Sequence, residues 1–358
     1  MNALSRNTLS SRLALVGAAG AFLLALSACG QTVTAPPPAG EGSGAASSGT
    51  AGAIGGSATA SGPVSITNCG TELTFAEAPQ RAVGLSPAQT ELLLRLGVGK
   101  TLVGQAQTGL QALPALPADV ASQAAQIKVL SKGEPPAREE LLSVNPDLVL
   151  SPTSYEFTAE QDYASVEQLK KAGAQAYIAT GGCADRRASA VVTDLVTDIE
   201  NLGSLFRTPQ QAAQLSKQVK DRLAAVSQAN ASATAPTVAQ LFVDGKSLSA
   251  IGAGIEADII KQAGGKNVFR PDDKLFESFF AATVSPEQVA SLNPDAIVFA
   301  TTSDTQTASI EAYLRETFPQ VTAVKENRRV AVPSANLLPG TLGNVDAVEL
   351  ISQKIHDR

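Results

Sequence analysis

The chain has 358 residues, of which 17% are charged and 44% are hydrophobic, and its formal net charge at pH 7 is −6. This composition gives no basic surface that would indicate nucleic-acid binding. The single histidine, His356, lies near the C-terminus, which disfavours Ser-His or Cys-His catalysis and histidine-based metal sites. We therefore expect no catalytic residues, no resident metal and no cofactor.

Residues 1–28 are predicted to be an export signal. Two arginines precede an apolar stretch, residues 13–26, that is too short to span a bilayer as a helix. Residues 26–29 (LSAC) resemble the lipobox of bacterial lipoproteins. That resemblance implies cleavage before Cys29 and attachment of lipid to this cysteine. The alternative is an ordinary secretory signal followed by a chance cysteine.

Residues 29–63 are predicted to form a flexible tether, because they are rich in Gly, Ala, Ser, Thr and Pro and cannot bury a core. A tether of this kind reaches roughly 30 Å from its anchor. We expect an exported protein that is lipid-anchored to the outer face of the cytoplasmic membrane, at the cell surface or in a periplasm.

The two remaining cysteines form an even pair in an exported protein. Cys69 and Cys183 are therefore predicted to form a disulfide, and the alternative is two buried thiols. In the chain-entropy model, closing a loop of this length contributes about 4–5 kcal/mol to stability.

The first part of the domain alternates strands and helices. Ser86 is expected to cap a helix that has Pro87 at its first position and Gly97 just after its end. Proline-rich residues 105–136 are expected to be mostly loop. The elements expected here are strand 82–85, helix 86–96, strand 102–104, helix 163–173 and strand 176–178.

The chain contains one short unit twice, at residues 139–150 (EELLSVNPDLVL) and 287–298 (EQVASLNPDAIV). Each copy predicts a short helix that stops where Asn precedes Pro. An apolar strand follows, of the kind that is buried on both faces in parallel sheets. Two copies predict an α/β fold with two similar lobes, parallel sheets and a cleft between the lobes.

The middle of the chain is predicted to hold two helices, residues 191–205 and residues 208–226. Thr208 begins a capping-box pattern for the second helix. We divide the domain into an N-terminal lobe (64–186), connecting helices (187–229) and a C-terminal lobe (230–358). The elements expected in the second lobe, besides the repeat, are strand 238–243, helix 252–263, helix 310–316, strand 330–332 and helix 345–355.

Two nucleotide-binding patterns were weighed. Residues 97–101 (GVGKT) lack the first glycine of a phosphate-binding loop and follow a helix rather than a strand. Residues 252–257 fit G-x-G-x-x-A, and Asp272 follows at the spacing of a ribose-binding acid. The second pattern keeps open an alternative function, an exported dinucleotide-dependent α/β enzyme.

The chain resembles the class III substrate-binding lipoproteins of ABC transporters, which serve ferric siderophores, haem and cobalamin. The resemblance rests on residues 85–91 (LSPAQTE), both Asn-Pro-Asp units, residues 263–269 (AGGKNVF) and residues 344–347 (NVDA). It implies two α/β lobes joined by one long helix, here residues 208–226, and a ligand held between the lobes.

The resemblance also implies the partners. We expect a monomer that delivers a small ligand, a ferric siderophore, to an ABC permease dimer with a cytoplasmic ATPase. Cobalamin and haem are the alternative cargoes. Glu139 and Glu287 occupy the positions that dock to permease arginines in this family, although acids in the first turn of a helix also complement its dipole.

Candidate ligand residues are taken from the loops that follow strands. Aromatic side chains would cover an apolar ligand face, and polar ones would orient the ligand. The candidates are Gln89, Thr108, Tyr155, Glu156, Asp244, Phe279, Phe280 and Asn336. The chain has no tryptophan, which many relatives carry shortly before the second repeat. Arg270, Arg328 and Arg329 are either contacts for an anionic iron complex or plain surface charge.

Overall fold

A computed structural model describes residues 62–109 and 116–356, which form one unit by their contacts. The predicted export signal, Cys29 and nearly all of the predicted tether lie outside the described residues. Among the helices of this part of the chain, none is both long and apolar enough to cross a membrane.

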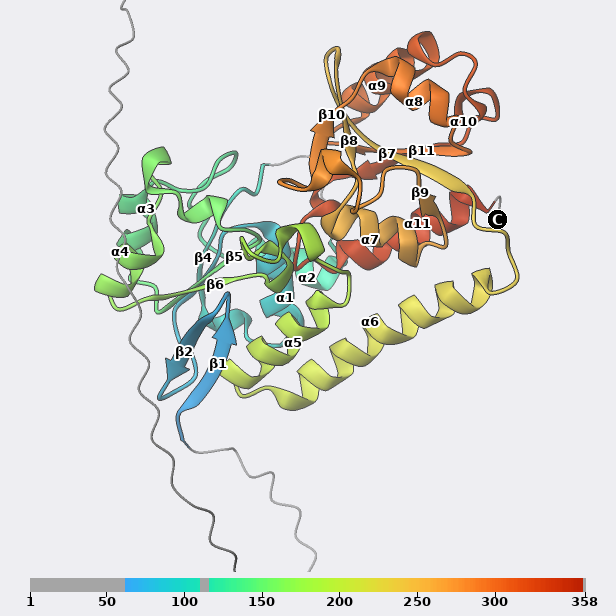
Figure 1. Cartoon of the computed structure of the whole chain (residues 1–358). Coiled ribbons are helices and arrows are strands. Elements are labelled where there is room, and N and C mark those ends of the chain that lie inside the picture. The colour runs from blue at the N-terminus through green and yellow to red at the C-terminus, as the bar shows by residue number, and fades with distance from the viewer. Residues whose placement is uncertain (1–61, 110–115, 357–358) are drawn as a thin grey trace, which may run out of the picture. The chain divides into compact units, whose positions relative to one another are not determined.

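The first lobe is built on a four-stranded parallel sheet with the strand order β4-β3-β5-β6 (Figure 1). Its apolar strands are buried on both faces, as Leu148, Val149 and Leu150 of β5 illustrate. Helices cover both faces of the sheet. The elements are β3 (Ala82–Gly84), α1 (Pro87–Arg95), β4 (Leu102–Gln105), α2 (Ala118–Ala124), α3 (Arg138–Ser143), β5 (Leu148–Ser151), α4 (Val166–Lys171), β6 (Gln175–Ile178) and α5 (Asp194–Leu205).

An antiparallel hairpin precedes this sheet, formed by β1 (Val64–Asn68) and β2 (Thr71–Phe75). Side chains join it to the edge strand β6. The Asn68 amide donates to the Ile178 carbonyl at 2.7 Å and accepts from the Ile178 N–H at 2.9 Å. Gln175 donates to the Thr74 carbonyl at 2.7 Å. The edge of the first sheet is therefore closed by side-chain hydrogen bonds rather than by a fifth strand.

The second lobe contains a six-stranded mixed sheet with the order β10-β8-β7-β11-β12, in which β9 also pairs with β7. Strands β7, β9, β11 and β12 pair in parallel, as expected, and β8 and β10 add an antiparallel edge to the sheet. The elements are β7 (Thr237–Asp244), β8 (Ser247–Ile251), α7 (Gly254–Gln262), β9 (Lys266–Asn267), β10 (Ala281–Thr283), α8 (Pro286–Leu292), β11 (Ala296–Thr301), α9 (Asp304–Thr317), α10 (Thr322–Lys325), β12 (Arg329–Pro333) and α11 (Gly343–Ile355).

The antiparallel strand β8 arises from a tight turn at the end of β7. Asp244 pairs with Ser247 across the turn, and Gly245 has φ of +57°. An Asp-Gly pair between apolar segments favours such a hairpin, because glycine adopts positive φ at little cost. The turn therefore sends the chain back along β7.

The repeated unit has the same structure in both lobes. Asn145 and Asn293 lie just beyond α3 and α8 with φ of +44° and +41°, the left-handed conformation that asparagine can adopt at the end of a helix. The aspartate that follows each proline holds the start of the neighbouring strand. Asp147 accepts from the N–H groups of residues 80 and 81 at 2.6 and 3.0 Å, and Asp295 accepts from the Thr237 N–H at 2.8 Å.

The lobes are joined by α6 (Pro209–Asn230), a 22-residue helix that is yellow in Figure 1. It is longer than the predicted span, and at 1.5 Å per residue it extends for roughly 33 Å. Ser86 and Thr208 are the N-cap residues of α1 and α6, as expected, and a proline follows each. Neither side chain makes a cap bond, and the Ser86 hydroxyl donates to the side chain of Gln89 instead.

One hydrophobic core is shared by the two lobes. Leu148 of β5 and Val298 of β11 belong to the same cluster, which helices α5, α6 and α11 complete. The residues beside them, Val149 and Ile297, face separate cores that include residues of α3 and α4 in one lobe and of α9 in the other. Because separating the lobes would expose the shared core, large opening motions are disfavoured.

Candidate functional site

A cleft of about 500 Å³ lies between segments of the two lobes. Its first side is formed by residues 153–155, which directly follow β5. Its second side is formed by residues 278–280, which precede β10. The third side comes from residues 182–188, in the segment that leads from β6 to α5. The cleft therefore lies where ligands bind in open α/β sheets, beyond the carboxyl end of a parallel strand.

Three predicted aromatic residues meet at this cleft. Tyr155, Phe279 and Phe280 all line it, and the two phenylalanine rings lie 4.2 Å apart between centroids. Tyr155 is 49% exposed and Phe279 is 56% exposed. Large apolar rings left open to solvent around a concavity are typical of a binding surface.

Arg187 also lines the cleft, and sequence reasoning missed it. Its guanidinium carbon lies 4.7 Å from the centroid of the Phe280 ring, the geometry of a cation–π contact. Nothing in the sequence distinguishes it from Arg186, whose Nε donates to Asp194 at 3.0 Å. Only the fold shows that one arginine is paired with a carboxylate while its neighbour faces the cleft.

Glu156 supports the cleft rather than lining it. The buried carboxylate accepts a hydrogen bond from the Thr153 hydroxyl at 2.7 Å and lies 2.8 Å from the Ser151 hydroxyl. The Thr153 hydroxyl in turn accepts from the Tyr155 N–H at 3.1 Å. This network fixes the loop that carries the Tyr155 ring into the cleft.

Two glycines allow the third side of the cleft to pack closely. A Cβ on Gly182 would lie 1.9 Å from the carbonyl oxygen of Pro152. Gly254 has φ of +72°, and a Cβ there would lie 2.7 Å from the Arg187 carbonyl oxygen. Any larger residue at these positions would displace the segment that carries Arg187.

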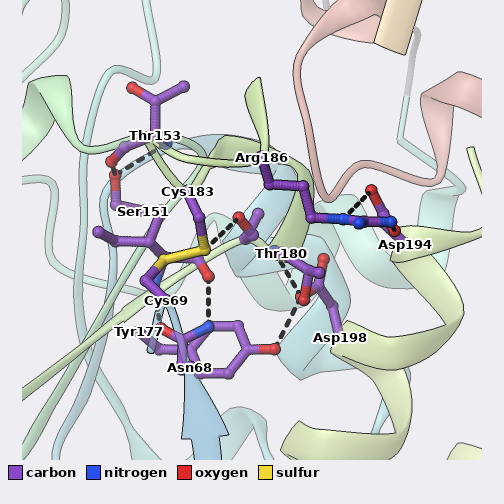
Figure 2. The surroundings of a disulfide bond; sticks show 12 residues. Asn68, Cys69, Ser151, Thr153, Tyr177, Thr180, Cys183, Arg186, Asp194 and Asp198 are labelled. Atoms are coloured by element: carbon purple, nitrogen blue, oxygen red, sulfur yellow. Dashed lines mark hydrogen bonds and ion pairs between the residues drawn. A yellow bond between two sulfur atoms is a disulfide. The ribbon is translucent and has the colours of Figure 1, made fainter. Parts of the chain in front are cut away.

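The same segment is covalently anchored by a disulfide between Cys69 and Cys183 (Figure 2). Figure 2 shows Thr180 beside it, whose N–H and hydroxyl donate to Asp198 at 2.8 and 2.7 Å. The Tyr177 hydroxyl donates to the same oxygen at 2.7 Å. Burial raises the pKa of Asp198 to about 6, because its carboxylate is removed from water.

The other predicted ligand residues do not line the cleft. Gln89 is buried in α1, and Asn336 is buried before α11, where its carbonyl accepts from Asn344 at 2.7 Å. Thr108 is half-buried in the loop after β4. Asp244 lies at the β7–β8 turn and borders a separate hollow of about 330 Å³. Following a strand is therefore too weak a criterion for a cleft residue.

The arginines considered from the sequence serve local structure. Arg270 pairs with Asp273 at 3.2 Å in an exposed loop. Arg328 pairs with Glu326 at 2.7 Å, and the buried Arg329 donates to the Val324 carbonyl at 3.1 Å. None of the three lines the cleft between the lobes.

The glycine-rich pattern at residues 252–257 is not built as a dinucleotide-binding turn. The preceding strand, β8, is antiparallel to β7, whereas that motif requires a parallel strand leading into a helix. The space beside Gly252 is filled by the Phe276 ring, which would lie 2.3 Å from an added Cβ. The glycine thus accommodates an aromatic side chain.

Glu139 and Glu287 occupy equivalent positions in the two lobes. Each lies exposed in the first turn of a helix, α3 or α8. Arg138 pairs with Glu139 and lowers the pKa of that carboxylate. A hydrogen bond from its own backbone N–H lowers the pKa of Glu287. Across residues 62–109 and 116–356, no group of three or more His, Cys, Asp and Glu side chains is arranged to hold a metal ion.

Comparisons with known proteins agree with this architecture. A cobalamin-binding protein of Halobacterium salinarum is 28% identical over 249 residues, which cover 68% of this chain and 59% of that relative. The match thus spans less than two thirds of the relative's length. Among solved structures, a periplasmic binding protein from Veillonella parvula is 23% identical with a TM-score of 0.72, covering 83% of this chain and 98% of that one.

A second solved structure comes from an ABC-type Fe3+-hydroxamate transport system of Saccharomonospora viridis. It is 24% identical with a TM-score of 0.67, and the alignment covers 82% of this chain and 99% of that one. These likenesses show a shared fold. The family model described as periplasmic binding protein matches residues 83–335, which is most of the chain. With the two lobes, the single connecting helix and the cleft between them, the match shows that the chain belongs to the periplasmic binding protein family, a family of solute binders rather than enzymes.

Proposed function

We propose that this protein is the substrate-binding component of an ABC importer and that it carries a ferric siderophore. The observation that supports this most directly is the cleft between the lobes, into which both lobes contribute exposed aromatic side chains. An apolar surface with a few polar groups is suited to holding a chelate whose metal is already coordinated. The iron is then part of the cargo.

Ligand binding would stabilise the folded protein by mass action, which makes a thermal-shift panel the direct test. A ligand present at 100 times its dissociation constant adds about 2.7 kcal/mol, which corresponds to several degrees in Tm. The panel contains ferric siderophores, cobalamin, haem and nicotinamide dinucleotides, with iron-free siderophores as matched controls. A shift with a ferric siderophore and none with the dinucleotides supports the proposal.

Cobalamin is the second candidate cargo, because the Halobacterium salinarum relative is described as a cobalamin-binding protein. Haem is a third, and it shares the large apolar surface that the aromatic cleft would cover. A shift with cobalamin or haem alone would keep the transport function and replace the cargo. A shift with a dinucleotide alone would contradict the proposal as a whole.

Glu139 and Glu287 are proposed to dock to the permease. Their exposure and their equivalence in the two lobes suit a partner with two-fold symmetry. Cells with Glu139→Ala and Glu287→Ala together should lose uptake, while the purified variant keeps its ligand affinity. Glu167→Ala with Glu316→Ala, which changes two exposed glutamates outside the repeat, is the matched control. Normal uptake by the first double variant would contradict the assignment.

The membrane anchor through Cys29 belongs to the same proposal. Mass spectrometry of protein purified from membranes should find lipid on Cys29 at a new N-terminus. A Cys29→Ser variant should leave the membrane fraction. Retention of that variant on membranes would exclude this anchor.

A further inference from the structure

The hydrogen bonds of the fold do not use all the donors of Arg187. Its Nη1 is buried and has no hydrogen-bond partner, and it forms no ion pair with any carboxylate of the described residues. Arg186 beside it pairs fully with Asp194, through two nitrogens and both carboxylate oxygens. An arginine that only stabilises the fold is expected to be paired as Arg186 is, because a buried guanidinium donor without a partner lowers the stability of the fold.

The nearest acids lie beside Arg187 without pairing with it directly. Glu256 and Glu156 both interact with it electrostatically. The Glu256 carboxylate accepts from the Gln240 amide at 2.9 Å, and the Glu156 carboxylate accepts from the Thr153 hydroxyl at 2.7 Å. Neither acid lines the cleft, and among the described residues that do line it, Arg187 is the one that carries a charge.

Arg187 is also held firmly in place. Its carbonyl oxygen lies against Gly254 of α7, where there is no room for a Cβ. Further along the same segment, the Val192 N–H donates to Asp258 of α7 at 2.8 Å, and Cys183 is fixed by the disulfide. The Phe280 ring covers one face of the guanidinium, and a cation–π contact of this kind uses none of its N–H donors. A rigid donor of this kind loses little entropy on binding.

We propose that Arg187 is the anion-recognition residue of the cleft and that the ligand is a chelate with negatively charged oxygens on an apolar body. This inference rests on the proposed function and narrows its cargo. The guanidinium edge pairs with catecholate or carboxylate oxygens, while Tyr155 and Phe279 cover the apolar part. A ferric tris-catecholate fits this description, and so does haem through its propionates. A cationic ferric complex does not fit it.

The test uses three ferric siderophores that differ in net charge. Ferric enterobactin is a trianion, ferrichrome is neutral and ferrioxamine B is a cation, and haem provides a second anionic probe. Their affinities are measured by isothermal titration calorimetry with the wild-type protein, Arg187→Ala, Arg187→Lys and Arg186→Ala. Melting temperatures of the variants confirm that each is folded.

The wild type should prefer an anionic probe, and Arg187→Ala should weaken that binding by about 10- to 100-fold, as expected when a charged hydrogen bond is lost. Binding of neutral ferrichrome, where it is detectable, should change little. Arg187→Lys keeps the positive charge but loses the paired N–H donors of the guanidinium. Its affinity for the anionic probe should lie between those of the wild type and Arg187→Ala. Arg186→Ala should lower the melting temperature, because the pair with Asp194 is lost, and should leave the affinity for the anionic probe nearly unchanged.

Two failures are distinguishable. If a chelate binds but its affinity depends neither on net charge nor on Arg187, this inference is wrong and the proposed function stands. If none of these probes binds the wild-type protein and cobalamin gives no thermal shift, both are wrong. Equal losses for anionic and neutral probes in Arg187→Ala would also contradict anion recognition, since they would indicate a general disturbance of the cleft.

Discussion

At the residue scale, the aspartate of each Asn-Pro-Asp unit fixes the start of a neighbouring strand. Asp147 accepts two backbone N–H bonds just before β3, and Asp295 accepts from the N–H of the first residue of β7. These bonds fix the start of β3 relative to β5 in the first lobe. They fix the start of β7 relative to β11 in the second. The shared Asn-Pro-Asp letters thus reflect a structural requirement, whereas the shared glutamates do not take part in it.

Replacing Asp147 with alanine should leave two backbone donors without their acceptor. We expect a loss of about 1–3 kcal/mol in the free energy of unfolding, measured by chemical denaturation. Asp221→Ala is the control, because Asp221 lies exposed on α6 in a surface pair with Lys217, and its loss should stay within about 0.5 kcal/mol. Equal effects of the two substitutions would argue against this role for Asp147.

The buried carboxyl of Asp198 predicts a pH dependence of stability. Its pKa rises from 3.8 to about 6 on folding, so the folded state binds its proton more tightly than the unfolded chain. The protonated carboxyl therefore contributes its full stabilisation to the folded state below pH 3.8, the pKa in the unfolded chain. This contribution is lost as the pH rises to about 6, the pKa in the folded state. The loss amounts to about 3 kcal/mol.

Asp198→Asn should remove this contribution. Unfolding free energies measured from pH 4 to pH 7 should therefore fall less steeply in the variant than in the wild type. Asp221→Asn, at an exposed site, should retain the wild-type slope. Parallel curves for the wild type and Asp198→Asn would show that this carboxyl does not titrate in the predicted range.

At the scale of elements, the contact between α5 and α6 depends on a glycine inside a helix. A Cβ on Gly203 would lie 2.2 Å from the Cβ of Ala212, so the helices approach more closely than any side chain would allow. Alanine is intrinsically the better helix former. Here, however, the steric conflict should exceed that preference.

Gly203→Ala should therefore destabilise the protein by about 1–3 kcal/mol, the usual cost of overpacking. Gly133→Ala provides the control, because no atom lies within 4 Å of the added Cβ and φ is not positive there. Thermal unfolding of both variants measures the difference. A Gly203→Ala variant as stable as Gly133→Ala would show that the helices move apart at little cost.

Elements buried on both faces were predictable from sequence, and the strand fixed by a turn was not. The apolar strands β5 and β11 follow directly from their composition. The hairpin of β7 and β8 was missed although its Asp-Gly turn is a known signal. The N-cap positions of Ser86 and Thr208 were predicted, but their side-chain cap bonds do not form. The Ser86 hydroxyl donates to Gln89, and the buried Thr208 hydroxyl has no hydrogen-bond partner among the described residues. Arg187 could not be selected, since its role depends on contacts between distant segments.

At the scale of the whole molecule, the two lobes share a core and are joined by the disulfide-anchored segment as well as by α6. The double variant Cys69→Ser with Cys183→Ser should lose about 4–5 kcal/mol in the chain-entropy account, because the disulfide closes a loop spanning 114 positions. Denaturation of the wild type with and without reductant provides a second measurement. A reduced wild type as stable as the oxidised protein would contradict the expectation.

The disulfide also decides how a pulling force would travel through the protein. Tension applied to the chain ahead of Val64 would pass along β1 to Cys69 and cross directly to Cys183. The strands of the first sheet, which lie within the closed loop, would be spared that covalent load. The force would continue through the segment that carries Arg187 and into α5. A membrane tether would therefore pull on one side of the cleft before it strained the sheet.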